Sequence, residues 1–549
     1  MDGLRIGNEL DEKTKALILR MEKELELRDK ELASKNKEIN ELKNELEYLK
    51  GQVLNKNRKI FGQSSEQIDS NQISLFDEAE KCCDIKAVEP TIEEITYKRN
   101  KPSSYIGKKD NLANLERVVI EHKLDKDKAN CDKCNSKLVV IGTKSKELLK
   151  YKPAELYIEE HITYSYACKV CEEVEGKVNI VTTKAPNTFL YKSMASNELL
   201  SHVINLKYQF ALPLYRQETY FDMLGANLSR QTLSNWIIGA AKEFEPVYNI
   251  MKEKLLESHY VQADETTVVV VDPKGEDSKA KKYMWLYKTG EYKDPIVLYD
   301  YQKTRSSSCP RDFLKGFSGI LQTDGYSGYN YVANAERLYC LAHIRRKYFE
   351  IVTKLDEEAL KKSRAVIGFN FCEQLYKIEK DLREKYEGID DYYKNRYKTR
   401  LEKSAPIIEE FIKYVDIEIN NALPKSPLGA ALEYSRKLLP SFRTFLTDGS
   451  LEIDNNGAER AIKPFVIGRK NWLMCNTPKG ARASAIIYSI VETAKSNGLV
   501  VEKYLVYLMD MMSNLENKDK DTLLKYMPWS KELPETVKFQ NKNLHNKKD

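Results

Sequence analysis

Long hydrophobic runs are absent from this chain of 549 residues. The longest apolar stretches, 266–271 and 485–491, fall far short of the roughly 20 residues that a membrane-spanning helix needs. The amino terminus is rich in charge and has no apolar core of a secretion signal. These absences predict a cytoplasmic protein without a membrane partner.

A large charge of one sign is absent as well, since 89 Lys and Arg stand against 83 Asp and Glu, a net charge of +6. This mild basic excess is compatible with a nucleic-acid partner but does not require one. In a reducing compartment, the ten cysteines favour metal ligands or buried thiols over disulfides. The length exceeds what one hydrophobic core fills, so we expect about three to five structural units.

A heptad repeat dominates residues 10–50. The residues that recur at every seventh position are Ile18, Leu25, Leu32, Ile39 and Leu46. This period predicts a coiled coil that ends near Gly51, and therefore self-association, at least as a dimer. A single amphipathic helix is the alternative, because Arg28 and Lys35 interrupt the companion row. The basic segment KRNKPSSYIGKKD at 98–110 predicts a linker that either contacts phosphates or stays solvated.

Four cysteines form two closely spaced pairs, Cys131 with Cys134 and Cys168 with Cys171. Each C-x-x-C pair turns two sulfurs to one side, and two such pairs complete a tetrahedral zinc site. We therefore predict a ribbon-like module with structural Zn²⁺, supported by strand-like alternation at 156–168. Coincidental buried thiols are the alternative, and His161 is not expected to be a ligand.

A helix-turn-helix pattern occurs within 195–245. Gly225 marks a turn and Ser229 an N-cap. The apolar face that follows consists of Leu233, Trp236 and Ile237. The outer face carries Arg230, Gln231, Ser234 and Asn235. This pattern favours a DNA-binding element, although an ordinary helical hairpin explains it equally well.

From residue 260 the pattern changes to strands. Runs rich in β-branched and aromatic residues predict strands at 260–271, 282–288, 295–301, 317–322 and 337–340. The first run carries Asp264, and the fourth delivers Asp324 before a turn at Gly325 and Gly328. Three antiparallel strands with a central carboxylate, followed by a fourth strand that ends in another, predict an RNase H-like core with a mixed five-stranded sheet.

A third carboxylate, Glu459, opens a predicted helix that is expected to meet Pro464. The capping residues before it are Asp454, Asn455 and Asn456. Residues 350–450 are helical in pattern and poor in glycine, which predicts an α-helical insertion into the core. Carboxylates from the sheet and this helix supply the hard oxygen ligands that a pair of magnesium ions needs. Each carboxylate also has an ordinary alternative as a turn residue, a cap or part of a charged surface helix.

Four separated motifs resemble, in order, the IS66-type insertion-sequence transposases. They are QADET around Asp264, TDGYSGY around Asp324, CLAH at 340–343 and DNNGAERAIKPFVIGRKNW around Glu459. RKIFGQSSE, the paired C-x-x-C motifs and the stretch from PLYRQE to TLSNW also resemble parts of that family, so the resemblance covers nearly the whole chain. Leu341 stands where the family usually has Trp, and Lys463 where it usually has Arg.

The resemblance implies a DDE transposase that cuts the 3′ ends of its element and joins them to target DNA. Asp264, Asp324 and Glu459 are then the catalytic ligands of Mg²⁺ or Mn²⁺. The side chains expected to contact DNA are Arg230, Gln231, Asn235, Arg345, Arg346, Arg460, Lys463, Arg469 and Lys470. Structural support near the site is expected from Cys340, His343 and Asn456. Two ligands from a C-x-x-H pair alone make an unconvincing metal site.

The implied partners are double-stranded DNA at the element ends and at the target, and a second copy of the chain; small helper proteins of the same element stay an open question. The implied location is the prokaryotic nucleoid. Two other functions also stay open, namely an RNase H-like nuclease without strand transfer and a domesticated DNA-binding protein without catalysis.

The predicted fold class is multidomain α+β. An RNase H-like core is interrupted by an α-helical insertion and preceded by a coiled coil, a zinc ribbon-like module and a helix-turn-helix region. The predicted boundaries are 1–54 for the coiled coil, 55–114 for the linker, 115–188 for the zinc module, 189–256 for the helical DNA-binding region, 257–352 and 449–515 for the two parts of the core, 353–448 for the insertion, and 516–549 for the last helix and tail.

Overall fold

The computed structural model describes several positions between 20 and 35, and residues 154–168, 179–271, 281–290 and 294–539. The chain separates into two compact units, one of residues 1–83 and 159–549 and one of residues 84–158. In the second unit, the described residues 154–158 have no regular secondary structure. In the first unit, the described positions between Arg20 and Lys35 are helical. The heptad positions, the linker and the side chains of the four paired cysteines lie outside the described residues.

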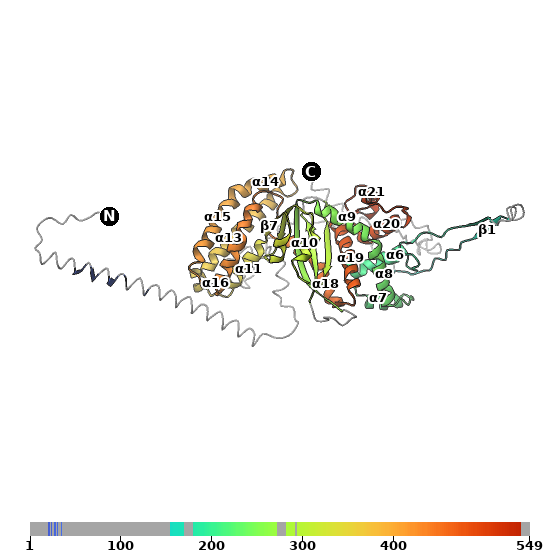
Figure 1. Ribbon diagram of the computed structural model, residues 1–549, viewed down its shortest axis with the longest axis horizontal. Helices are drawn as coiled ribbons and strands as arrows, with labels where there is room; N and C mark the ends of the chain where they lie inside the picture. The colour runs from blue at the N-terminus through green and yellow to red at the C-terminus, as the bar shows by residue number, and fades with distance from the viewer. Residues whose placement is uncertain are drawn as a thin grey trace, which may run out of the picture. The chain divides into compact units, whose positions relative to one another are not determined.

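A mixed sheet forms the centre of the larger unit (Figure 1). Its order is β5-β4-β3-β6-β7, in which β3, β4 and β5 are antiparallel neighbours while β3, β6 and β7 run parallel. The bounds are Tyr260–Val270 for β3, Lys282–Thr289 for β4, Val297–Gln302 for β5, Gly319–Thr323 for β6 and Ala335–Tyr339 for β7. All five predicted strands are therefore confirmed, with ends shifted by up to a few residues.

A sixth strand, β8 at Met474–Cys475, pairs in parallel with the end of β3. The five-strand prediction missed it, because two residues are too short to show an alternating pattern. The predicted strand at 156–168 is also shorter in the structure, where β1 spans only Ser165–Cys168 and pairs with β2, Asn179–Thr182. Its preceding residues, including Tyr157 and Ile158, are exposed and have no regular secondary structure.

Within residues 179–259 of the described chain, four helices precede the sheet. They are α6 at Asn197–Tyr208, α7 at Leu214–Met223, α8 at Arg230–Glu243 and α9 at Glu245–Leu256. Between α7 and α8 the chain turns at Gly225, whose φ of +86° favours glycine. Ser229 caps α8 by accepting a hydrogen bond of 3.1 Å from the backbone N–H of Thr232. The helix–turn–helix geometry is thus present, with Leu233 and Trp236 buried on its inner face.

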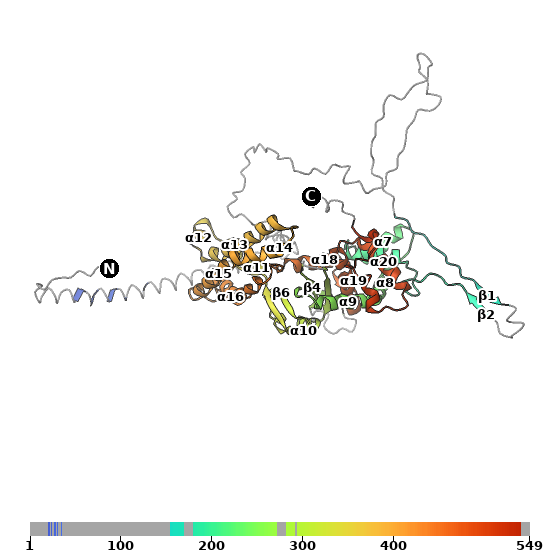
Figure 2. The same cartoon turned by 90° about the horizontal axis from the view of Figure 1, so that it is seen from above.

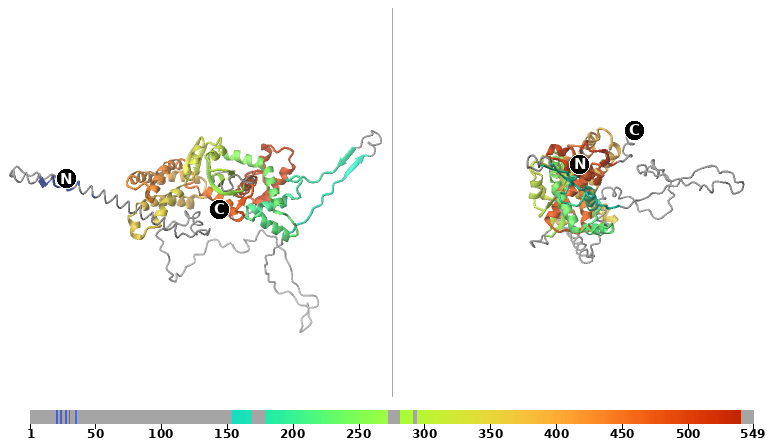
Figure 3. Two further views of the ribbon diagram at one scale, coloured as in Figure 1. Left: turned by 60° about the horizontal axis from the view of Figure 1, so that its bottom comes forward. Right: turned by 90° about the vertical axis from the view of Figure 1, so that its right-hand side faces the viewer.

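After β7, helix α11 at Leu341–Val352 leads into a group of helices in the region for which the sequence predicts an insertion (Figure 3). These are α12 at Glu357–Lys362, α13 at Arg364–Tyr386, α14 at Tyr392–Thr399, the π-helical turn Arg400–Ser404, α15 at Ala405–Glu418, α16 at Pro427–Leu438 and α17 at Phe442–Phe445. They pack with α11 around their own hydrophobic core, which includes Phe369, Phe411 and Leu432. The sheet and the remaining helices share a second core that includes Trp285 and Tyr488.

Four further α-helices follow within the described residues 449–539, of which α18, α19 and α20 are labelled in Figure 2. They are α18 at Asn456–Trp472, α19 at Pro478–Ser496, α20 at Val501–Asn514 and α21 at Lys520–Leu524. Helix α19 lies along the outer edge of β5, where the hydroxyls of Ser489 and Thr493 accept the backbone N–H groups of Tyr299 and Val297 at 2.8 and 3.0 Å. The open edge of the sheet is therefore satisfied by a helix.

Two sequence expectations about this region need correction. Helix α18 does not end at Pro464 but continues to Trp472. The hydroxyl of Tyr299 donates to the carbonyl of Ala461, one turn before the proline, which supplies a hydrogen bond where the helix ladder is disturbed. The expectation of a tail within 516–549 does not hold as far as residue 539, because Val537 is buried and the backbone N–H of Phe539 donates to the carbonyl of Gly498 at 2.8 Å. No described helix is long and apolar enough to cross a membrane.

Candidate active site

Asp264 and Asp324 come from two neighbouring parallel strands. Gln262 of β3 pairs in register with Gln322 of β6, and each aspartate follows two residues later along its strand direction. Because side chains alternate with a period of two, this register directs both carboxylates to the same side of the sheet. Asp324 lies just past the end of β6, where its Oδ1 accepts the backbone N–H of Tyr326 at 2.9 Å.

Glu459 is the fourth residue of α18, and the start of that helix is held against β3. The side-chain amide of Asn455 donates to the carbonyl of Ala263 at 2.9 Å, next to Asp264. Gly457 lies so close to β3 that an added Cβ would come within 2.3 Å of Gln262 Oε1. The sequence predicted a capped helix here, but Asn455 makes no side-chain cap bond and instead joins the helix to the sheet.

The three carboxylates act on one another electrostatically. Burial raises the pKa of Asp264 well above its usual range, and the charges of Glu265, Glu459 and Asp324 raise it further. Burial also raises the pKa of Glu459 to about 7; Arg346 opposes that shift, whereas Asp454 and Asp324 add to it. Such mutually repelling, half-desolvated carboxylates gain from a shared cation. Their hard oxygen donors fit a divalent ion such as Mg²⁺.

A buried polar network lies beneath the carboxylates. The side-chain amide of Gln262 donates to Gln322 Oε1 at 2.8 Å and to the carbonyl of Asp454 at 3.2 Å. Gln322 in turn donates to the carbonyl of Glu452 at 2.7 Å, and Tyr260 donates to Gln322. The network ties β3 and β6 to the segment that leads into α18, so the three catalytic candidates share one rigid support.

Sequence reasoning missed a fourth carboxylate, Glu265, whose side chain is only 3% exposed. Its carboxylate accepts the hydroxyl of Tyr329 at 2.5 Å and the guanidinium Nε of Arg305 at 2.7 Å. Burial raises its pKa. The only signal was its place beside Asp264 in QADET, and alternation along a strand sends neighbours to opposite faces. Its partners lie 40 and 64 positions away, which local patterns do not reveal.

Cys340 and His343 lie beside Glu459. Cys340 precedes α11, and its Sγ accepts the backbone N–H of Asn455 at 3.1 Å. His343 Nδ1 is 4.0 Å from Glu459 Oε1. Burial and the charge of Arg346 lower the pKa of His343 to about 4, so the ring is neutral near pH 7 and this contact is not an ion pair there. Asn456 donates to Asp454 Oδ2 at 2.8 Å, which shapes the loop before α18.

Several of the basic side chains predicted to contact DNA are at the surface. Arg230, Gln231 and Asn235 are exposed on α8, and Gln231 donates to Asn235 at 3.0 Å. Arg460 and Lys470 are exposed on α18. Lys463 and Arg346 are partly buried. These residues stay candidates for DNA contact.

Two predicted DNA contacts have other partners in the structure. Arg345 is buried, with 4% exposure, and its guanidinium donates to Glu373 at 2.5 Å. Arg345 lies on the side of α11 that packs into the insertion core. The basic run IRRK did not indicate which of its side chains would be buried. Arg469 donates to the carbonyl of Thr267 and to Thr266 Oγ1 at 3.3 Å, so it braces α18 against β3.

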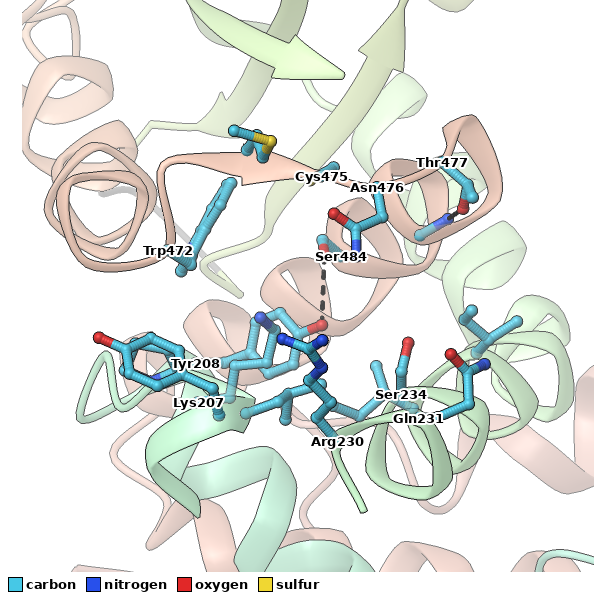
Figure 4. Close-up of a pocket in the computed structure, with 17 residues that line it drawn as sticks. Lys207, Tyr208, Arg230, Gln231, Ser234, Trp472, Cys475, Asn476, Thr477 and Ser484 are labelled. Carbon is cyan, nitrogen blue, oxygen red and sulfur yellow. Dashed lines mark hydrogen bonds between the residues drawn. The ribbon is translucent and has the colours of Figure 1, made fainter. Parts of the chain in front are cut away.

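A pocket of about 550 Å³ lies between the helix-turn-helix and the far end of α18 (Figure 4). Lys207 and Tyr208 from α6, Arg230 from α8 and Trp472 from α18 line it. The ammonium of Lys207 lies 5.4 Å from the ring centre of Trp472, and burial lowers the pKa of Lys207. Tyr208 and Ser484 hydroxyls are 3.3 Å apart across its floor. Lys207 was not among the predicted contacts, because its sequence context is an ordinary apolar helix.

Comparison with known proteins gives three family matches. Residues 192–483, more than half of the chain, match "Transposase IS66 family". Residues 128–172 match "zinc-finger binding domain of transposase IS66", and residues 48–120 match "Transposase C of IS166 homeodomain". These two stretches lie mostly outside the described residues, as do the side chains of the four paired cysteines.

Similar proteins occur in Sinorhizobium fredii (strain NBRC 101917 / NGR234). "Uncharacterized protein y4qI" is 30% identical over 405 residues, which cover 70% of this chain and 71% of that protein. "Uncharacterized protein y4jD" is 28% identical over 417 residues, which cover 73% and 78%. No solved structure matches the chain. The family match across the sheet, the insertion and α18, together with the first relative, shows that the chain belongs to the IS66 family of transposases.

Proposed function

We propose that this transposase has an RNase H-like core and acts by the DDE mechanism, cutting the 3′ ends of its element and joining them to target DNA. The observation that carries the proposal is the gathering of Asp264, Asp324 and Glu459 from β3, β6 and α18 around one buried, mutually repelling set of carboxylates. The order of strands around β3, with antiparallel neighbours on one side and parallel ones on the other, supports the fold assignment.

Asp264, Asp324 and Glu459 would hold the metal ions. When bound, Mg²⁺ or Mn²⁺ supplies activation of the attacking oxygen and charge stabilisation at the leaving oxygen of a phosphodiester. The protein's part is to fix the carboxylates and to exclude bulk water. Asn455 and the Gln262–Gln322 pair hold the three supporting elements in register. Arg346, whose charge already acts on Glu459, adds positive charge where a scissile phosphate would lie.

The DNA would lie across the exposed basic residues of α18 and α8. Arg460 and Lys470 are on the same helix as Glu459, and Arg230 is at the start of α8. Since a helix rises about 1.5 Å per residue, Trp472 and the Lys207 pocket lie about 20 Å along α18 from Glu459. This distance corresponds to about six base pairs of duplex, so both ends of α18 fit one bound DNA segment.

The amino-terminal parts complete the proposal. The two C-x-x-C pairs would hold structural Zn²⁺ in the module that matches the zinc-finger family. The heptad repeat would join at least two copies, which suits a reaction on two element ends. The domain boundaries stated from the sequence are retained as part of this proposal.

A strand-transfer assay with Mg²⁺ and DNA that carries the element ends tests the function. The wild type is expected to give joined products, and Glu459→Gln is expected to bind DNA normally but to cut at least about 100-fold more slowly. Glu433→Gln, an exposed carboxylate on α16, is the matched control and should cut normally. Normal cutting by Glu459→Gln would remove Glu459 from the site. Cleavage without joining would instead favour a nuclease, and binding alone a non-catalytic protein.

A further inference from the structure

Three side chains with different ligand atoms converge where α11 and α18 begin. They are Cys340, His343 and Glu459, whose sulfur, nitrogen and oxygen atoms all lie within 4.8 Å of one another. Within the part of the chain that the structure describes, no other group of three or more His, Cys, Asp or Glu residues is as close. Cys340 and His343 are three residues apart at the start of α11, so they present the same face of the helix.

His343 Nδ1 is buried and lacks a hydrogen-bond partner among the described residues. The nearest acidic oxygen, Glu459 Oε1, is 4.0 Å away, which is beyond hydrogen-bond distance. A buried ring nitrogen without a partner costs folding free energy, and native structures have few of them. A cation between His343 and Glu459 would satisfy both atoms.

The environment of Cys340 suits a metal-bound sulfur. The residue is 1% exposed, and its Sγ accepts the backbone N–H of Asn455 at 3.1 Å. An N–H directed at sulfur is the kind of outer contact that orients and stabilises a metal-bound thiolate. The same Asn455 carbonyl accepts the backbone N–H of Glu459 at 3.1 Å, so one residue fixes both ligands relative to each other.

We propose that Cys340, His343 and Glu459 form a site for a thiophilic divalent cation of the zinc type, and that filling this site inhibits cleavage by withdrawing Glu459 from the two aspartates. Sulfur, imidazole and carboxylate together select zinc-like ions, whereas magnesium avoids sulfur. Ligand atoms around a tetrahedral zinc are about 3.3–3.8 Å apart, so side-chain shifts of about 1 Å close the site. The nearby charge of Arg346 opposes any cation there, and two anionic ligands offset it.

The inhibition rests on the proposed function, but the binding does not, and the first experiment therefore measures binding alone. Full-length protein is dialysed against Zn²⁺, and its zinc content is compared with that of Cys340→Ser and His343→Asn. Cys372→Ser is the matched control, because Cys372 is an equally buried free thiol in the insertion core. We expect the wild type and Cys372→Ser to hold one zinc more per chain than the two site variants. Equal zinc content in all four proteins would overturn the site.

A second probe guards against a variant that fails to fold. Cd²⁺ bound to thiolate absorbs in the ultraviolet, and Glu459→Gln keeps both Cys340 and His343 while removing one anionic ligand. This variant should bind Cd²⁺ more weakly than the wild type but with the same thiolate absorption at saturation. Unchanged Cd²⁺ affinity in Glu459→Gln would show that Glu459 is not a ligand and would overturn the three-residue site.

The inhibition is then measured at fixed Mg²⁺, with the rate of each protein compared with its own zinc-free rate. Zinc at about ten times its Kd should slow cleavage by the wild type about tenfold, as mass action requires, and should slow Cys340→Ser much less. Equal inhibition of both proteins would overturn the inhibitory role. If no protein cleaves DNA but the extra zinc is bound, the proposed function fails while the site stands.

Discussion

At the scale of single residues, the fold holds the carboxylates of the candidate site where burial and like charges oppose their ionisation. Asp264 and Glu459 are placed where burial and neighbouring charges favour the protonated carboxyl. The folded-state pKa of each is above the ordinary carboxyl value, so ionising them costs folding free energy at neutral pH. Ligand binding recovers this cost, which is why such carboxylates mark functional positions more often than structural ones.

The raised pKa of Glu459 leads to a prediction about the pH dependence of metal binding. Because metal ions bind the ionised carboxylates, binding must displace protons below the raised pKa of Glu459, which is about 7. The Mg²⁺ concentration for half-maximal cleavage should therefore rise at least about tenfold per pH unit as the pH falls below about 7, because the pKa of Asp264 is raised as well. Mg²⁺ titrations of single-turnover cleavage between about pH 6 and pH 8 measure this. A requirement that stays constant over this interval would contradict the raised pKa of Glu459.

At the scale of elements, local sequence patterns predicted the strands and helix starts but not the contacts between distant segments. The β-branched run at Thr266–Val270 specified β3, and Ser229 specified the start of α8. The register of Gln262 with Gln322 depends on pairing across 60 positions, which no local pattern contains. The same holds for Arg345, which bonds Glu373 through the insertion core 28 positions away.

The candidate carboxylates were found from motifs rather than from geometry. Asp264, Asp324 and Glu459 are far apart in sequence, and the strand pattern, the predicted helix at Glu459 and the family resemblance together joined them. Glu265 shows what motif matching leaves out, since this buried carboxylate is recognised only by its hydrogen bond from the distant hydroxyl of Tyr329. The continuation of α18 past Pro464 could not be predicted either, because the hydroxyl of Tyr299 in β5 donates to the carbonyl of Ala461 in that helix. Tertiary contacts, absent from any sequence window, decide these features.

Helix α13 of the insertion is joined to the loop before α18 by a buried ionic cluster centred on Glu379. Its carboxylate accepts hydrogen bonds from Arg396 at 3.0 Å and from Arg400 at 2.8 Å. Arg396 also holds Glu452 at 2.9 Å, and Arg400 donates to the carbonyl of Leu451 at 2.8 Å. Burial acts to raise the pKa of Glu379, but the two arginines outweigh it and lower that pKa. The insertion thereby positions the segment that carries Glu459.

Removing this central charge should destabilise the protein. Glu379→Gln leaves two buried guanidiniums without their shared counter-charge, and we expect a loss of about 3–5 kcal/mol in the free energy of unfolding. Urea denaturation measures the loss. Glu409→Gln is the control, because its ion pair with Arg443 at 2.8 Å is exposed, and it should change the stability little. A similar small effect of both substitutions would mean that the cluster is not needed to hold the insertion.

At the scale of the whole molecule, a structural zinc site is predicted for the module that the sequence places at residues 115–188. Cys131→Ser should remove one structural zinc per chain and increase proteolysis within residues 115–188, because two C-x-x-C pairs are needed to close the site. The helical and strand content of the core should persist in circular dichroism. The control is Cys309→Ser, which changes a buried free thiol in the short helix α10 at Ser308–Phe313. Zinc content that stays unchanged in Cys131→Ser would remove the ribbon prediction.

The helix that lies along β5 has a consequence for how copies of this protein assemble. The hydroxyls of Ser489 and Thr493 accept backbone N–H groups of β5 at one edge of the sheet. At the opposite edge, the hydroxyl of Ser441 accepts the backbone N–H of Tyr339 in β7 at 3.3 Å. A strand from another molecule would compete with these contacts for backbone groups at both edges. Subunits are therefore expected to associate through side chains and helices. Association of sheets edge to edge into a filament is expected to be unfavourable.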